Sequence, residues 1–331
     1  MRRFPFLSSF LFLLLALLLS LAIGSVFLSP RELFNAITGH GSELANSILW
    51  KIRLPRTVLI ALTGMALGGS GAAYQGLFRN PLADPFLIGI ASGAGLGAVI
   101  AMTVEWPYSF WGLMAIPLGA FVGALLTVAI VYFLARVGQT TPVTNLILAG
   151  VAVSAFATSL MSFLMLRSDG ELRRAMSWLM GGSTQLGWAF TLAILPYIII
   201  GLGALIFSGH ALNLLQFGDE QAQQLGLDTT RAKRIILICA SLATASAVAF
   251  SGIIGFIGLV VPHLSRLWFG SDYRRLLPLS ILGGATILLL SDVIARVVLA
   301  PQELPVGIVT ALAGAPFFLW VLRSSKTQGL W

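Results

Sequence analysis

The sequence has very little charge for its length. Only 10% of its 331 residues are Asp, Glu, Lys or Arg, whereas 57% are hydrophobic and the mean hydropathy is +0.94. A soluble domain carries about 25% charged residues. The composition therefore excludes an ordinary soluble domain and indicates an integral membrane protein. The net charge of +8 does not indicate a nucleic-acid partner, because the sequence contains no run of five or more basic residues.

Residues that carry chemistry are also scarce. The single cysteine, Cys239, excludes an intrachain disulfide and is typical of a small buried hydrophobe. None of the three lysines lies in a G-x-x-x-x-G-K-[ST] phosphate-binding loop, and the three histidines are too far apart in sequence to suggest metal ligands. We expect no catalytic, cofactor or metal site, and we expect any ATP hydrolysis to occur on a separate chain.

The centres of the apolar segments contain almost no ionisable residues. Ion-coupled carriers need such groups at membrane depth to bind or relay the driving ion. Asp292 and Arg296 are four residues apart near the end of one segment, which fits a local helix pair. Backbone carbonyls can also bind sodium, so an ion-coupled secondary carrier stays as an alternative, and a structural membrane scaffold is a second one.

The abundant feature is apolar sequence in segments of about 20 residues, the length that spans a bilayer as a helix. They predict an all-α integral membrane protein with ten transmembrane helices in a single domain, residues 1–331. The predicted spans are 6–28, 57–76, 86–104, 110–135, 143–166, 189–208, 235–250, 253–267, 276–300 and 305–322. The first apolar run is longer than that of a signal peptide and has no clear cleavage site, so we interpret it as an uncleaved span.

The distribution of basic residues predicts the orientation. If Arg2 and Arg3 are cytosolic, twelve of the 20 Lys and Arg residues lie inside and eight outside, which agrees with the positive-inside rule. An even number of spans then places both termini in the cytosol. The eight outer cations need a separate explanation.

Glycines recur at helix-packing spacing, as in Gly64-x3-Gly68, Gly119-x3-Gly123 and Gly89-x3-Gly93-x3-Gly97. Small residues four apart let helix backbones approach closely in lipid. A weaker pattern is Ser70-Gly71 before Pro81 and Ser251-Gly252 before Pro262, at equal spacing. An inverted internal repeat is one interpretation of this pattern and chance is the other.

One polar stretch interrupts the apolar chain, FGDEQAQQLGLDTTRAKR at residues 217–234. Six predicted spans precede it, so we expect it in the cytosol. From the residues alone it fits a solvated loop held to lipid phosphates through Arg231, Lys233 and Arg234. The alternative is an amphipathic element that docks another protein, which would have the same mixed polar and apolar character.

Several stretches together resemble a known family. They are LPRTVLIALTGMALGGSGAAYQGLFRNPLADPFLIGIASGAGLGA (54–98), FGDEQAQQLGLD (217–228), SGIIGFIGLVVPHLSRL (251–267) and ELPVGIVTALAGAPFFLWVL (303–322). From about residue 30 onwards the chain is similar to the permease subunits of bacterial ABC importers for iron-siderophore complexes, haem and cobalamin. The resemblance implies ten helices per subunit, a homodimer around a central pathway, two cytosolic ATPase subunits, an extracytoplasmic binding protein and a place in the bacterial cytoplasmic membrane.

The resemblance also implies roles for particular residues. The 217–234 segment would be the coupling element, two short helices broken near Gly226 that fit a cleft of the ATPase, with Asp219, Glu220, Leu225, Gly226 and Leu227 as its main residues. Asp219 and Glu220 would start the first helix, where negative charge suits the helix dipole.

At the outer surface, Arg53, Arg56 and Arg296 would pair with acidic residues of the binding protein, and the alternative is that they reach for lipid phosphate. At the inner end, the turns RNPLADP and TTPVTN would narrow the pathway through Asn80, Leu82, Val143 and Thr144. Their prolines and asparagine also fit tight turns.

The expected function is therefore the permease of an ATP-driven importer that performs no chemistry itself. Its cargo would be an iron-siderophore-type chelate, with haem and corrinoids as alternatives, because family members for all three share these motifs.

Overall fold

The computed structural model describes residues 4–24, 29–107, 109–138, 140–167, 172–182 and 187–328. Arg2 and Arg3 lie outside the described residues. Within these ranges the regular structure is helical, apart from an isolated bridge between Val137 and Thr140. The all-α class predicted from the sequence is confirmed.

Ten long helices and several short ones form the described part of the chain. The long helices are α1 (Pro5–Ala22), α4 (Leu54–Phe78), α5 (Ile90–Met102), α6 (Phe110–Ala135), α7 (Val143–Arg167), α9 (Trp188–Phe207), α12 (Thr229–Ser251), α13 (Ile257–Phe269), α14 (Tyr273–Val297) and α15 (Val306–Gln328). The short ones are α2 (Pro30–Ile37), α3 (Glu43–Ser47), a π-helical turn (Ile48–Arg53), a 3₁₀ turn (Pro85–Ile88), α8 (Leu172–Leu179), α10 (Gly209–Leu215) and α11 (Asp219–Gln224). Among the described residues, seven helices are long and apolar enough to cross a membrane, and α5, α13 and α15 are shorter apolar helices.

Two boundaries differ from the sequence prediction for clear reasons. The helix that ends with α4 already begins at Glu43, because α3 and the π-helical turn continue into it. The polar residues at the start of this helix lower the local hydropathy, so the predicted span began only at residue 57. The eighth span begins only at Ile257, because Gly252 and Phe256 both have a positive φ of 69° and interrupt the helix before α13.

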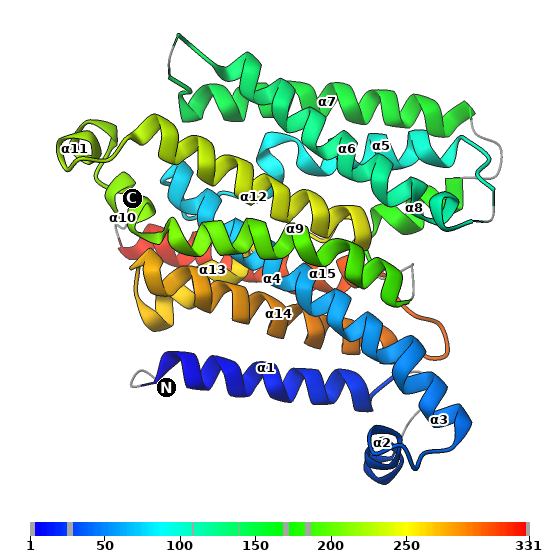
Figure 1. The fold of residues 1–331 in the computed structure, drawn as a ribbon. Coiled ribbons are helices and arrows are strands. Elements are labelled where there is room, and N and C mark those ends of the chain that lie inside the picture. The colour runs from blue at the N-terminus through cyan, green and yellow to red at the C-terminus, as the bar shows by residue number, and fades with distance from the viewer. Residues whose placement is uncertain are drawn as a thin grey trace.

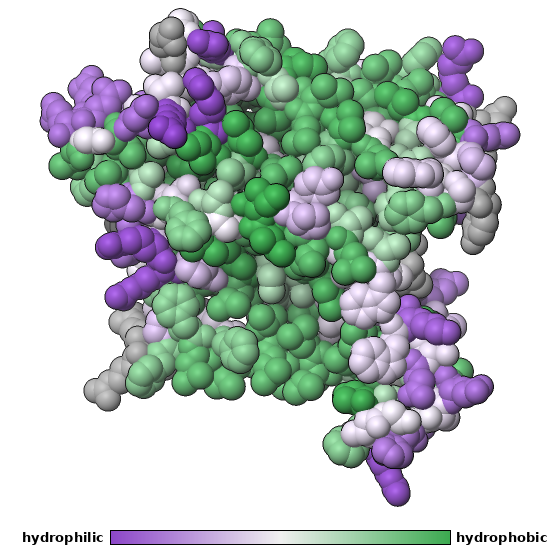
Figure 2. All heavy atoms as spheres, viewed as in Figure 1, coloured by the Kyte–Doolittle hydropathy of each residue, from purple (hydrophilic) through white to green (hydrophobic). Residues whose placement is uncertain are grey.

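The helices lie side by side as a bundle with two polar ends (Figure 1). The start of α1, the end of α15 and the α10–α11 segment lie at one end, and α2, α3 and α8 lie at the other. Figure 2 shows apolar residues across the middle of one face and hydrophilic residues gathered at these two ends. This pattern is that of a membrane-spanning bundle, and both termini are at the same end, as predicted.

Helix α4 is the centre of the bundle. Every residue from Ala66 to Phe78 is buried, and the helix contacts α9, α12, α13 and α14. Buried hydroxyls join it to α12, with Thr63 Oγ1 2.7 Å from Ser251 Oγ and Tyr74 Oη 2.7 Å from Ser241 Oγ. Hydrogen bonds of this kind satisfy polar groups that lipid cannot.

Glycines set the distance between the central helices. A Cβ added at Gly64 would lie 2.4 Å from the carbonyl oxygen of Gly284 on α14, and one at Gly71 would lie 2.0 Å from that of Gly258 on α13. Helices α5 and α6 also have close backbones, since a Cβ at Gly97 would lie 2.1 Å from the carbonyl oxygen of Gly119. The predicted role of the four-residue glycine spacing is confirmed, whereas the inverted repeat stays a prediction.

We expect Gly64→Val to destabilise the protein by about 1–3 kcal/mol or more, because a side chain cannot fit against the α14 backbone without moving it. The measurement is the thermal stability of the purified chain in detergent, followed by size-exclusion chromatography. Gly203→Val is the matched control, since a Cβ at Gly203 of α9 would meet no atom within 4 Å. Equal stability of the two variants would contradict the packing role of Gly64.

Candidate coupling and gating site

The polar segment between α9 and α12 folds as two short helices. Helix α10 ends at Leu215 and α11 begins at Asp219, with Gly218 between them at a φ of +100°, a conformation that favours glycine. Asp219 and Glu220 occupy the first turn of α11. Helices α10 and α11 are therefore separated at 216–218, and the break expected near Gly226 is present between α11 and α12, which is a long helix rather than a second short one.

Gly226 ends α11. Its φ is +87°, its amide donates to the carbonyl of Gln223, and the amide of Leu227 donates to that of Ala222. These two bonds form a Schellman C-cap, for which glycine is the preferred residue because a left-handed conformation is required. Leu227 packs against the core, whereas Leu225 is 61% exposed. Large apolar side chains are thus exposed on both sides of α11, Leu225 after the helix and Phe217, 63% exposed, before it.

Helix α11 is tied directly to the start of α12. Asp228 caps α12 by accepting a hydrogen bond of 2.9 Å from the amide of Arg231. Lys233 of α12 pairs with Asp219 at the start of α11, and Gln223 Nε2 donates to Thr229 Oγ1 at 2.9 Å. The short helix therefore has polar connections to α12 at both of its ends.

Helix α10 connects the same segment to α4 and α14. Asn213 uses both ends of its amide: Nδ2 donates to Asp272 Oδ1 at 2.6 Å, and Oδ1 accepts from the amide of Tyr273 at 2.8 Å. Gln216 Nε2 donates to the carbonyl of Gly76 at 3.0 Å, near the end of α4. A displacement of α11 would consequently act on three long helices.

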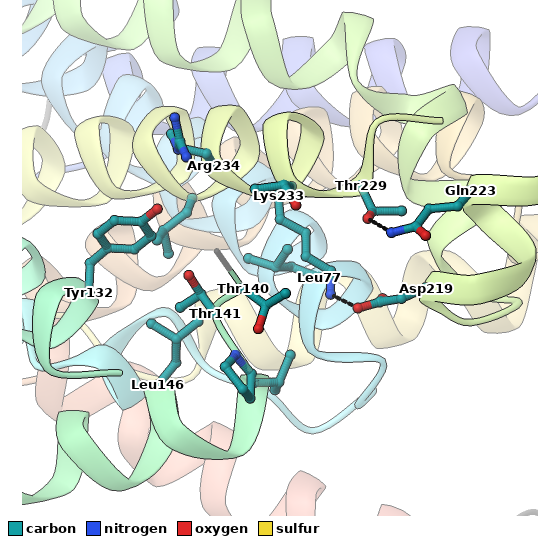
Figure 3. Close-up of a pocket in the computed structure, with 14 residues that line it drawn as sticks. Leu77, Tyr132, Thr140, Thr141, Leu146, Asp219, Gln223, Thr229, Lys233 and Arg234 are labelled. Carbon is teal, nitrogen blue, oxygen red and sulfur yellow. Dashed lines mark hydrogen bonds and ion pairs between the residues drawn. The ribbon is translucent and has the colours of Figure 1, made fainter. Parts of the chain in front are cut away.

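A cavity of about 250 Å³ lies between α11, α12 and the turn that joins α6 to α7 (Figure 3). It is lined by Leu77, Tyr132, Thr140, Thr141, Pro142, Val143, Leu146, Asp219, Gln223, Thr229, Thr230, Lys233, Arg234 and Leu237. The cavity brings together one residue of the predicted coupling set, Asp219, and one of the predicted gate, Val143. These two residues, 76 apart in sequence, thus line the same cavity.

The other predicted gate residues lie outside this cavity. Asn80 forms a turn, with its Oδ1 accepting from the amide of Leu82 at 2.9 Å, and Thr144 is exposed in the first turn of α7. The role of all four residues as a gate stays a prediction. The turn geometry expected for the asparagine is present.

Sequence reasoning missed the side chains that hold the segment in place. Asn213 and Gln216 lie in the apolar stretch before residue 217, where an amide among leucines is the signal that could have marked them. Thr140, Thr141 and Gln223 lie in the turn and the polar stretch that the sequence marked, but nothing distinguished them from their neighbours. Tyr132 carries no sequence signal, because only the tertiary contacts bring it to the cavity.

The predicted docking arginines lie at the opposite end of the bundle, in a buried charged cluster. Arg56 donates to Asp292 Oδ1 at 2.9 Å and to Glu303 Oε2 at 2.6 Å. Arg296 Nε lies 3.0 Å from Asp292 Oδ2, which confirms the local pair expected on this helix. Asp292 is fully buried, so two guanidinium groups balance its charge.

The other contacts of these arginines are also internal. Arg53 donates to the carbonyls of Leu21 and Ala22, at the end of α1, and Arg296 donates to Ser20. Arg53 and Arg296 are only 4% and 3% exposed. In this chain Arg56 is the most accessible of the three, and their role in docking stays a prediction.

This fold, a bundle of apolar helices with short helices at one end and a buried charged cluster at the other, defines the class as a multi-pass membrane protein. Comparison with known proteins gives the family. The model of the FecCD transport family matches residues 12–324, and the chain belongs to this family.

Individual relatives agree with this assignment. The chain is 42% identical to the hemin transport system permease protein HmuU of Yersinia pestis, with 95% of each chain covered. It is 44% identical to the cobalamin import system permease protein BtuC of Halobacterium salinarum, over 87% of this chain and 76% of the relative. A solved structure of a transporter assigned to the metal-chelate ABC type, in an inward-facing conformation, matches with a TM-score of 0.84 and 30% identity, over 98% of this chain and 99% of that one. The chain is thus an ABC importer permease, a transport component, and the relatives differ in cargo.

We expect Asp272 to make the stability of the protein depend on pH in the acid range. Hydrogen bonds from Asn213 and Arg274 lower the pKa of Asp272 to about 2, from an ordinary 3.8. The ionised carboxylate therefore stabilises the folded state above about pH 4, and this contribution is lost as the pH falls from about 4 to about 2. The measurement compares the thermal unfolding of wild type and Asp272→Asn across this interval, where the wild-type advantage should shrink.

Asn213→Ala is the companion variant, because it removes the largest cause of the lowered pKa. It should reduce the difference that Asp272→Asn makes above pH 4. A wild-type advantage that is constant over the whole pH range would contradict the assignment.

Proposed function

We propose that this chain forms the translocation pathway of an ATP-driven importer in the bacterial cytoplasmic membrane. Two copies would bind two ATPase subunits at the α11 end and an extracytoplasmic binding protein at the end that carries Arg56. The supporting observation is the α11 element: a short helix at the end that holds both termini, with an exposed Leu225 and polar connections to three long helices.

The same contacts suggest how movement of the ATPase is transmitted. The Lys233–Asp219 pair would carry a displacement of α11 to α12, and Asn213 and Gln216 would carry it to α14 and α4. The α6–α7 turn borders the same cavity. A shift of α11 would change the shape of this cavity and move the turn that contains Val143.

The exposed face of α7 is evidence that the chain pairs with a second copy. Only 17% of the most apolar 18-residue stretch of this helix is buried. Thr158, Ser159 and Ser162 are among its exposed residues. Hydroxyls at membrane depth are typical of a surface that faces water or another protein rather than lipid. We infer that α7 borders the central pathway in a homodimer, and pairing with a related permease is the alternative.

The cargo we propose is an iron-siderophore-type chelate, with haem or a corrinoid as the alternative. Support for a metal chelate comes from the names of the relatives, which cover hemin and cobalamin, and of the matching transporter structure. An ion-coupled carrier that acts without an ATPase is not favoured, because family membership places the chain among ABC permeases.

Reconstitution in proteoliposomes tests this function. With the ATPase and the binding protein present, we expect ATP-dependent uptake of a ferric siderophore. Leu225→Asp should abolish both this uptake and co-purification of the ATPase, because it places a charge in the interface. Leu44→Asp, the same change on α3 at the far end, should keep the ATPase bound.

Other results would change specific parts of the proposal. Uptake of hemin or cobalamin instead would change the cargo alone. Normal coupling in Leu225→Asp would contradict the role of α11. Accumulation by the chain without an ATPase, driven by an imposed ion gradient, would favour a secondary carrier.

Docking of the binding protein gives a separate prediction through Glu303. The carboxylate of this half-exposed residue is paired with Nη1 of Arg56. A carboxylate of the binding protein would have to displace it in order to bind Arg56. We expect Glu303→Gln to raise the association rate by up to about fivefold, the range of an exposed ion pair. The measurement is surface binding across a salt series, where wild-type docking should weaken as the Debye length falls from about 10 Å at 0.1 M to about 3 Å at 1 M.

Glu43→Gln is the control, because Glu43 is an exposed carboxylate of α3 at the same end. It should leave the rate unchanged. A rate in Glu303→Gln that equals or falls below that of wild type would show that Arg56 is not the docking cation. Reversal of Arg53 is a poor test, since this side chain is buried against α1.

A further inference from the structure

A second cavity, mostly apolar, lies between α6 and α12. Its volume is about 230 Å³, and it is lined by Leu125, Val128, Ala129, Tyr132, Phe133, Arg234, Leu237, Ile238 and Ser241. Apart from Arg234, Tyr132 and Ser241, all of these side chains are hydrocarbon. At roughly 30 Å³ for a group the size of water, the groove has room for about eight methylene-sized groups.

The groove opens on a surface that faces the membrane. Its edges carry large apolar side chains exposed in the isolated chain, among them Phe133, which is 70% exposed, and Ile238. The neighbouring residues Leu126 and Ile130 of α6 are exposed as well. In a bilayer such a surface is in contact with acyl chains, so the occupant of the groove comes from the lipid.

The inner end of this groove meets the first cavity. Tyr132, Arg234 and Leu237 line both. Beyond them the lining is mixed: apolar side chains such as Val143 and Leu146 alternate with the hydroxyl-bearing Thr140, Thr141, Thr229 and Thr230. Figure 3 shows Thr140, Thr141 and Thr229 around this cavity. An apolar groove that leads into a cavity lined partly by hydroxyls matches the two parts of a phospholipid. The groove suits an acyl chain, and the cavity suits a headgroup.

Charge at the junction favours an anion. Arg234 lines both cavities, and Arg136, at the end of α6, is four residues after Tyr132 and so lies on the same face of that helix as this cavity-lining residue. Among the residues that the structure describes, no ion pair joins either arginine to a carboxylate, whereas Lys233 is neutralised by Asp219. Guanidinium groups bind phosphate well, and basic pockets between membrane helices on the cytoplasmic side are typical sites for anionic lipid headgroups.

We propose that these two joined cavities bind one anionic phospholipid, with its phosphate near Arg136 and Arg234 and one acyl chain in the groove between α6 and α12. The lipid contacts the α6–α7 turn and the chamber that α11 borders. A bound lipid would therefore favour one particular distance between the α6–α7 turn and α11. This consequence for ATP coupling rests on the proposed function, whereas lipid binding itself does not.

The test uses the full chain purified in detergent, without the ATPase, so that it is independent of transport. Native mass spectrometry compares retention of phosphatidylglycerol with that of phosphatidylcholine of the same acyl chains. We expect phosphatidylglycerol to be retained at least tenfold better at one site. The double variant Arg136→Gln/Arg234→Gln should lose this preference, and Ala129→Phe should lower retention by filling the groove while leaving both charges in place.

Two matched controls separate the site from general effects. Arg275→Gln removes another exposed arginine that lies outside both cavities, and Ile130→Phe enlarges an exposed α6 residue that does not line the groove. Both should retain the lipid as wild type does, and all variants should show the wild-type elution profile.

Two results would overturn the proposal. One is equal retention in wild type, the double arginine variant and Ala129→Phe. The other is displacement of the lipid by an equal concentration of glycerol phosphate, which has the anion but no acyl chain, because the site would then bind a soluble phosphate only.

Discussion

The close approach of α4 to its neighbours is the constraint on which the rest of the structure depends. Lipid is as apolar as leucine, so helices in a membrane gain little from hydrophobic burial and associate through van der Waals packing and internal hydrogen bonds. Gly64 and Gly71 bring the backbone of α4 against α14 and α13, where any side chain would collide with a carbonyl. Because α4 is enclosed along its length, it is the physical link between the two ends of the bundle.

The two ends use polar groups differently. At one end the charges are internal: Asp292 is fully buried between Arg56 and Arg296, and Arg53 and Arg296 bind the end of α1. Buried charges are costly unless they are paired and hydrogen-bonded, so this cluster fixes one arrangement of α1, α4 and α14. At the other end the polar contacts join short helices to long ones, through Asn213 and Gln216. The first end is held by buried ion pairs, and the second by hydrogen bonds between short and long helices, as the proposed transmission of displacement requires.

The joined cavities at the α11 end relate three elements that are distant in sequence. The α6–α7 turn, α11 and the first turns of α12 border one chamber, and Arg234 lies where that chamber meets the membrane-facing groove. With the roles proposed above, coupling, gating and contact with lipid would be neighbours in space, and a change in one would reach the others through this chamber.

The sequence by itself determined the all-helical membrane class, ten spans with both ends on one side, the glycine contacts and the family, because hydropathy, charge bias and small-residue spacing act locally along the chain. It also placed Asp219 and Glu220 in the first turn of α11. It anticipated the break near Gly226 but not the one at Gly218, since both glycines are equally suited to positive φ and only tertiary contacts decide where the helices end. Nor could it show that Arg53 and Arg296 are buried, because their partners, at residues 20–22 and Asp292, reach them only through packing. Only the tertiary structure decided which charges are internal, which are exposed, and that the gate turn and α11 share a cavity.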